Sequence, residues 1–135
     1  LLERISPNPL IELGPDGRDG WFRPLVTYLE SIGRTRGLDL ALVLPGHGPP
    51  FGDHRRVIDG LLGFQAQRQA RLRALLEGGP LDAWALCRAL FPAARPADAF
   101  LTVSETVGNL EVLEAAGEVL REERGGGWRW VLAAP

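Results

Sequence analysis

The most distinctive stretch of this 135-residue sequence is Leu44-Pro45-Gly46-His47-Gly48-Pro49-Pro50. It ends Leu38–Leu44, a short, almost continuous apolar run that favours a strand covered on both faces of an α/β sheet. Three prolines stiffen the stretch, and the glycines on both sides of His47 leave the backbone free to turn sharply. Because ligands bind outside the carboxyl ends of strands in open α/β sheets, His47 is a candidate functional residue. A polar turn in which His47 faces water is the alternative.

Helices are predicted on both sides of this stretch. Pro24 suits the first position of a helix that Gly37 can end. Asp53 is a good N-cap for a long helix with apolar residues at a period of 3.6, and Gly78-Gly79-Pro80 stops it. Near the start of the chain, short strands are expected within residues 1–13.

Two more helices are predicted in the last third of the sequence. Asp82 caps a short helix that carries Cys87 as a core thiol on its apolar side. Thr102-x-x-Glu105 has the pattern of a capping box at the start of the next helix, which ends at Gly117.

A β-hairpin is predicted at the end of the chain. Residues 118–124 and 128–133 have strand patterns around a glycine triplet. Trp128 and Trp130 share one face by their period of two and are expected in the core. Three helices followed by a hairpin is the order of elements in a winged helix, a variant of helix-turn-helix.

The composition is that of an ordinary globular protein. Its 15 basic residues, all arginine, and 17 acidic residues give a net charge of −2, so no overall field attracts nucleic acid or a membrane. No run approaches the roughly 18 apolar residues of a membrane span. The single cysteine excludes an internal disulfide and fits a reducing compartment, so we expect a cytoplasmic protein.

The sequence by itself cannot complete a metal site around His47. A catalytic zinc takes three protein ligands and keeps one open position. The other histidine of the sequence, His54, lies one residue into a predicted helix. A nucleophile elbow, a P-loop and a Gly-x-Gly-x-x-Gly motif are absent from the sequence. Further ligands for a metal at His47 would have to come from polypeptide outside this sequence.

Three segments resemble the C-terminal half of metallo-β-lactamase-superfamily hydrolases: Ile5-Ser6-Pro7-Asn8-Pro9, Tyr28-Leu29-Glu30-Ser31 and, above all, Leu44–Pro50. The order of elements after residue 78 resembles the branch with a C-terminal winged-helix domain. The resemblance covers nearly the whole chain. It implies an α/β fold in residues 1–77, the C-terminal portion of an αββα sandwich, followed by a small α+β winged-helix-like domain in residues 78–135.

The resemblance also implies a function and its residues. In that family the glycine-flanked histidine, here His47, is the last metal ligand, while a His-x-His-x-Asp-His loop, a further histidine and a bridging aspartate come earlier and do not occur here. The chain would then be a C-terminal fragment of a metal-dependent hydrolase of esters, thioesters or phosphodiesters, with two zinc ions in the intact protein. The fragment is expected to bind little or no metal and to be inactive alone. Asn8 falls near the site rim as a substrate-binding candidate, with an Asx turn as its alternative role.

Two other functions stay open: a winged-helix nucleic-acid-binding protein and a non-catalytic interaction module. The long helix carries five arginines against Asp59, which could contact phosphates or form ion pairs with the acidic last third. Residues 98–117 contain four acids and no basic residue, which argues against sequence-specific DNA binding. The expected partners are the missing N-terminal half of the hydrolase and a second copy of the chain, through apolar surface exposed where that half would dock.

Overall fold

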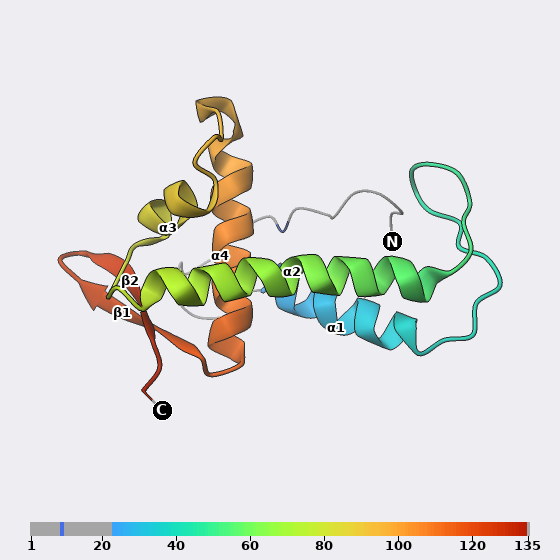
Figure 1. Cartoon of the computed structure of the whole chain (residues 1–135), viewed down its shortest axis with the longest axis horizontal. Coiled ribbons are helices and arrows are strands. Elements are labelled where there is room, and N and C mark those ends of the chain that lie inside the picture. The colour runs from blue at the N-terminus through green and yellow to red at the C-terminus, as the bar shows by residue number, and fades with distance from the viewer. Residues whose placement is uncertain (1–8, 10–22, 135) are drawn as a thin grey trace.

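The computed structural model describes Pro9 and residues 23–134, a mixture of helices and one β-hairpin. The elements follow in the order α1 (Pro24–Arg36), α2 (His54–Leu76), α3 (Ala83–Leu90), the short 3₁₀ helix η1 (Pro96–Asp98), α4 (Ala99–Ala115), β1 (Val119–Arg124) and β2 (Gly127–Leu132) (Figure 1). The short strands expected within residues 1–13 lie outside the described residues.

The helices α1 and α2 lie side by side, and α4 packs against both (Figure 1). Pro24 is the first residue of α1, as the sequence predicts, since proline has no N–H to leave unsatisfied there. Gly37 ends α1, and its N–H donates to the carbonyl of Arg34. The loop from α1 to α2 occupies one end of this pair of helices, and the hairpin occupies the other end.

Two aspartates cap the next helices, which confirms both predicted starts. The Asp53 side chain accepts a hydrogen bond from the Arg56 N–H at 3.3 Å, and Asp82 accepts one from Ala85 at 2.7 Å. Each carboxylate satisfies a backbone donor that has no partner within its helix.

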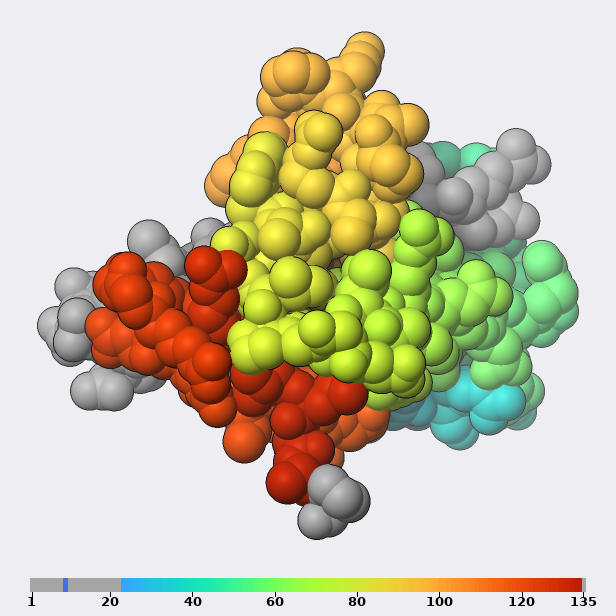
Figure 2. Space-filling view, turned by 60° about the vertical axis from the view of Figure 1, so that its left-hand side comes forward, coloured from blue at the N-terminus to red at the C-terminus, as the bar shows by residue number. Residues whose placement is uncertain are grey.

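In the space-filling view, α3 and η1 (yellow and orange) lie above the green surface of α2, and the hairpin (red) lies on the other side of it (Figure 2).

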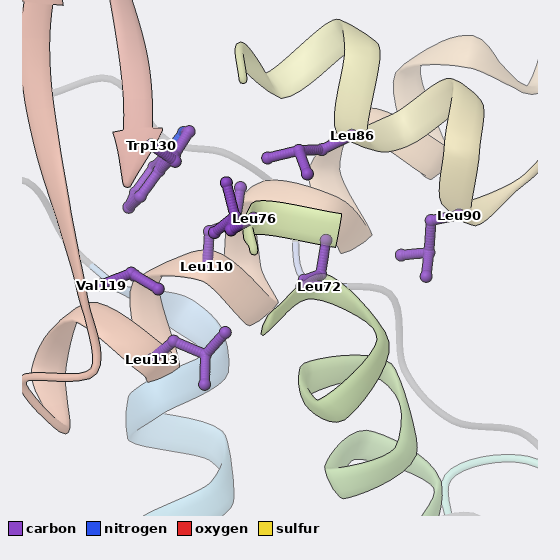
Figure 3. Packing of buried hydrophobic residues seen from close by; sticks show 8 residues of the cluster. All are labelled: Leu72, Leu76, Leu86, Leu90, Leu110, Leu113, Val119 and Trp130. Atoms are coloured by element: carbon purple, nitrogen blue, oxygen red, sulfur yellow. The ribbon is translucent and has the colours of Figure 1, made fainter. Parts of the chain in front are cut away.

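One hydrophobic core joins the end of α2 to all later elements except η1. It consists of eight residues that are almost fully buried: Leu72, Leu76, Leu86, Leu90, Leu110, Leu113, Val119 and Trp130 (Figure 3). The division of the chain at residue 77 stays a prediction.

The hairpin has the expected position, and its strands begin and end within one residue of the predicted bounds. β1 and β2 are antiparallel, and Arg124 pairs with Gly127 across a two-residue turn. Both turn residues, Gly125 and Gly126, have positive φ, at 60° and 78°, as a type I′ turn requires. The prediction for the tryptophans is half right: Trp130 is buried, whereas Trp128 is 50% exposed.

The predicted capping box at Thr102 is wrong. The chain enters α4 directly from η1, so Thr102 lies inside the helix rather than before it. Its hydroxyl donates to the carbonyls of Asp98 and Ala99, and Glu105 forms an ion pair with Arg68 instead of closing a box. The short helix η1, which begins at Pro96, leads into α4 in place of the predicted capping box.

The strand predicted over Leu38–Leu44 is also wrong. The described residues contain one two-stranded sheet, the hairpin, and within residues 38–44 only Val43 makes a bridge, to Phe51. The side chains of Leu38, Leu42 and Leu44 are exposed instead of covered. An apolar run of this length does not by itself reveal whether anything covers it.

Within the described residues, no helix combines the length and the apolar character needed to cross a membrane.

Candidate functional site

The loop between α1 and α2 carries the Pro-Gly-His-Gly stretch. Where it leaves α1, two side chains at the start of α2 hold its backbone. The ring of His54, at Nε2, lies 3.1 Å from the carbonyl oxygen of Leu38, and the Arg55 guanidinium donates to the same oxygen at 2.7 Å. Arg55 also donates to the carbonyl of Arg36 at 3.3 Å. These carbonyls follow or end α1 and have no helical partner, so the contacts attach the loop to both helices.

The His54 imidazole has a structural role in this attachment. It is only 3% exposed, although it is one residue into α2. A carbonyl oxygen accepts hydrogen bonds and does not donate them, so Nε2 of His54 carries the proton of this contact. The sequence predicted the helical position of His54 but not this role, because the partner is a backbone atom sixteen residues away.

The two arms of the loop are joined halfway along. Val43 and Phe51 exchange two backbone hydrogen bonds, of 2.8 and 3.1 Å, and Phe51 is buried. This bridge closes residues 44–50 into a separate tip. Gly48 within the tip has φ of 87°, a left-handed conformation that favours glycine.

His47 lies exposed at this tip. The prediction that it follows a covered strand at a sheet edge is wrong for the described residues, which form no sheet there. The alternative of a turn with His47 facing water agrees with its exposure in this chain. Its role as a metal ligand stays a prediction, and Asn8, the predicted substrate-binding residue, lies outside the described residues.

The described residues do not make a complete metal site. No group of three or more His, Cys, Asp or Glu side chains among them could hold a metal ion. The nearest candidates along the chain are engaged elsewhere: Nε2 of His54 contacts Leu38, and the Asp53 carboxylate caps α2 and lies 3.3 Å from the Arg56 side chain. The described part of this chain therefore offers the His47 imidazole at the tip but no set of three ligands around a metal.

Three leucines of this loop have exposed side chains. Leu38 is 52% exposed, Leu42 is 56% exposed and Leu44 is 76% exposed. We call these three residues the loop leucines. Exposed leucines are candidates for contact with other polypeptide when they adjoin one another.

Four of the five arginines of α2 form ion pairs, and the fifth, Arg71, donates to the carbonyl of Ala89. Arg68 lies 3.0 Å from Glu105 and Arg73 lies 2.6 Å from Glu118, so both pair with the acidic last third as the sequence analysis had allowed. Asp59 binds Arg36 of α1 through both carboxylate oxygens. That hydrogen bonding holds the pKa of Asp59 below its usual range.

No family model matches the sequence. One curated protein and two solved structures do match it, and their names describe a metallo-hydrolase or β-lactamase-type proteins. A "Probable metallo-hydrolase YqjP" of Bacillus subtilis is 40% identical over 115 residues, which are 85% of this chain and 36% of that protein. A solved β-lactamase domain protein from Burkholderia ambifaria superposes with a TM-score of 0.78 at 29% identity, covering 93% of this chain and 37% of the other.

A second solved structure agrees with the first. A metallo-β-lactamase family protein from Thermus thermophilus superposes with a TM-score of 0.72 at 32% identity, covering 98% of this chain and 39% of that chain. The chain thus spans little more than a third of the length of each of these proteins.

Proposed function

We propose a function that follows from the family of this chain, which belongs to the metallo-β-lactamase family as a C-terminal part of its fold. The proposed function is to supply one metal ligand, His47, to a longer hydrolase. The observation that supports this role is the construction of the loop. A single imidazole lies between two glycines at a tip that a backbone bridge closes and that two side chains of α2 attach at its root. A metal ligand needs such restraint, because coordination fixes the direction of the lone pair within narrow limits.

The remaining ligands would come from the other part of the fold, which we propose packs on the loop leucines. Their exposure is expensive in water, at roughly 25 cal/mol per Å² of apolar surface left uncovered. Covering them would bring the tip against the polypeptide that carries the earlier ligands. The missing N-terminal half of the hydrolase is therefore the partner that we assign to this surface.

The metal that we propose is zinc, in a two-ion site, and the substrates are esters, thioesters or phosphodiesters. Zinc in such sites activates water and polarises the group to be cleaved. The name of the Bacillus relative, a probable metallo-hydrolase, supports hydrolysis as the reaction class. The chain itself contributes the ring of His47, and this restrained loop determines where that ring lies.

We also propose that residues 78–135, together with the end of α2 on which they pack, form a winged-helix-like unit used for packing rather than for reading DNA. The helix α4, which would enter a major groove, has no lysine or arginine. Two of its carboxylates are already paired, Glu105 with Arg68 and Glu114 with Arg23 and Arg121. Sequence readout needs side-chain donors aimed at base edges. The balanced charge and the single cysteine support a cytoplasmic protein.

The replacement His47→Ala in the longer protein tests the metal role. The variant is expected to lose bound metal and turnover while its circular dichroism spectrum stays unchanged, because an exposed side chain contributes little to folding. Metal content by elemental analysis and hydrolysis of a model ester are the two measurements. The matched control is Arg34→Gln, an exposed change on α1 that should alter neither. Full metal content in His47→Ala would refute the assignment.

The 135-residue chain provides a second test. Because the described residues contain no group of three metal-binding side chains, the chain is expected to bind zinc weakly and to hydrolyse nothing. Tight, stoichiometric zinc binding by the chain alone would contradict the view that most ligands lie elsewhere.

A further inference from the structure

A small pocket opens between α3 and the segment that runs from η1 into α4. Its volume is about 180 Å³, and its wall is largely apolar, formed by Trp84, Phe91, Ala94, Pro96 and Ala99. Of these, Trp84 is 53% exposed, an unusual position for the largest side chain of α3. The pocket belongs to the raised part of the molecule formed by the yellow and orange segments in Figure 2. It adjoins the half of α2 that is remote from the His47 loop.

Two of the polar side chains around the pocket have partners within the described residues. Arg95 binds Asp98 through two hydrogen bonds, of 2.9 and 3.2 Å, and these raise the pKa of Arg95. The hydroxyl of Thr102 donates to backbone carbonyls of the same segment. Arg88, which also lines the pocket, makes no hydrogen bond or ion pair within the part of the chain that the structure describes.

Arg88 is unusual among the arginines of this molecule. Every other arginine in residues 23–134 has a carboxylate, hydroxyl or carbonyl partner. Arg88 lies in the last turn of α3, where a positive charge favours the helix end. The residue is exposed, so its guanidinium donors are open to water and can bind an anion at the mouth of the pocket.

We propose that this pocket binds a small apolar monocarboxylate, with the hydrocarbon part among Trp84, Phe91 and Pro96 and the carboxylate on Arg88. The size fits one ring or a short branched chain, because an apolar cavity of about 150 Å³ is known to hold benzene. A guanidinium matches the two oxygens of a carboxylate in a paired geometry. One unpaired cation balances one negative charge, which favours a carboxylate over a phosphate of charge about −1.5 to −2.

The test uses the 135-residue chain and phenylacetate, with phenylacetamide as the uncharged analogue of the same shape. Titrations followed by two-dimensional NMR are expected to show saturable shifts confined to the Trp84 indole and the amides of Ala94, Ala99 and Thr102. Phenylacetate should bind about tenfold more tightly than phenylacetamide, because only the acid makes charged hydrogen bonds to Arg88. This comparison needs no variant and so does not depend on how a mutant folds.

The variant Arg88→Gln should bind phenylacetate about tenfold more weakly and leave phenylacetamide binding unchanged. The matched control is Arg34→Gln, which removes an exposed arginine from α1 and should change neither affinity. Equal affinity for acid and amide, an unchanged affinity in Arg88→Gln, or shifts that never saturate or that lie outside the pocket would each overturn the proposal. The inference does not depend on the metal role of His47.

Discussion

Tyr28 on α1 is the single tyrosine of the sequence, and its hydroxyl is buried without a hydrogen-bond partner among the described residues. Burial raises the pKa of Tyr28, because the charged phenolate loses hydration that nothing replaces. At the scale of one residue, the surroundings thus decide which protonation state is stable. The helical spacing and the composition do not predict the raised pKa, because neither shows whether the Tyr28 hydroxyl has a hydrogen-bond partner.

An alkaline titration should show this effect. In the folded chain Tyr28 is expected to ionise above the usual value of about 10, and in denaturant it should return to that value. Because the pKa is higher in the folded state, its contribution to stability is complete below about pH 10 and is lost as the pH rises through the folded pKa. The ultraviolet absorbance of tyrosinate measures the ionisation directly. Identical titrations of folded and unfolded chains would contradict the burial of the hydroxyl.

Gly108 on α4 is a residue whose missing side chain makes packing possible. A Cβ atom there would lie 2.8 Å from Cγ of Pro9 and 3.3 Å from Cβ of Leu25, too close for either contact. We expect Gly108→Ala to destabilise the fold by up to about 2 kcal/mol, because a strain of about 1–3 kcal/mol offsets or exceeds the gain of about 1 kcal/mol in helix propensity. Thermal or urea unfolding measures the change.

The control for Gly108 is Gly63→Ala on α2. A Cβ atom at Gly63 would meet nothing within 4 Å, so this variant should gain up to about 1 kcal/mol from helix propensity alone. If both variants were stabilised, the close approach of Pro9 and Leu25 to α4 would be wrong.

At the scale of secondary structure, the elements whose ends carry chemical signals could be predicted. Pro24, Asp53 and Asp82 mark helix starts by what their atoms can or cannot donate, and all three are where the sequence places them. The run Leu38–Leu44 carries no such signal, because the chain is apolar there whether a neighbour covers it or not. The attachment of the His47 loop to α2 could not be predicted from the sequence. It depends on His54 and Arg55, which bind a backbone carbonyl that has no sequence signature.

The start of α3 allows its two roles to be measured separately. Asp82 caps the helix through Ala85 and also binds the Arg129 side chain at 2.7 Å. Asp82→Ala removes both contacts and should destabilise the fold by about 1–2 kcal/mol. Asp82→Asn keeps the cap and loses only the ion pair, which is partly exposed, so it should cost about 1 kcal/mol or less. Unfolding in urea compares the two variants, and equal losses would argue against the cap.

At the scale of the whole molecule, the loop leucines are among the exposed large apolar residues of the described chain. If no other polypeptide covers them, we expect the chain to self-associate at high concentration. Changing all three, Leu38, Leu42 and Leu44, to Gln should shift the chain to a monomer without loss of stability, because surface changes of this kind cost about 0.5 kcal/mol or less. Light scattering or sedimentation measures the assembly.

The control for the loop leucines is Leu120→Gln on the hairpin. Leu120 is also 50% exposed but lies at the other end of the molecule, so this change should leave the assembly as it is. A monomeric parent chain, or an assembly that persists in the triple variant, would show that the loop leucines do not mediate contacts between copies.

The shared core has a consequence for where the polypeptide can be cut. Leu72 and Leu76 belong to α2 but fill the space between α3, α4 and the hairpin. A piece that begins after α2 would lose both leucines, and the apolar side chains that pack against them would become exposed to solvent. The smallest autonomous piece of the C-terminal half must therefore keep α2, and a domain transplanted to another protein would have to bring that helix along.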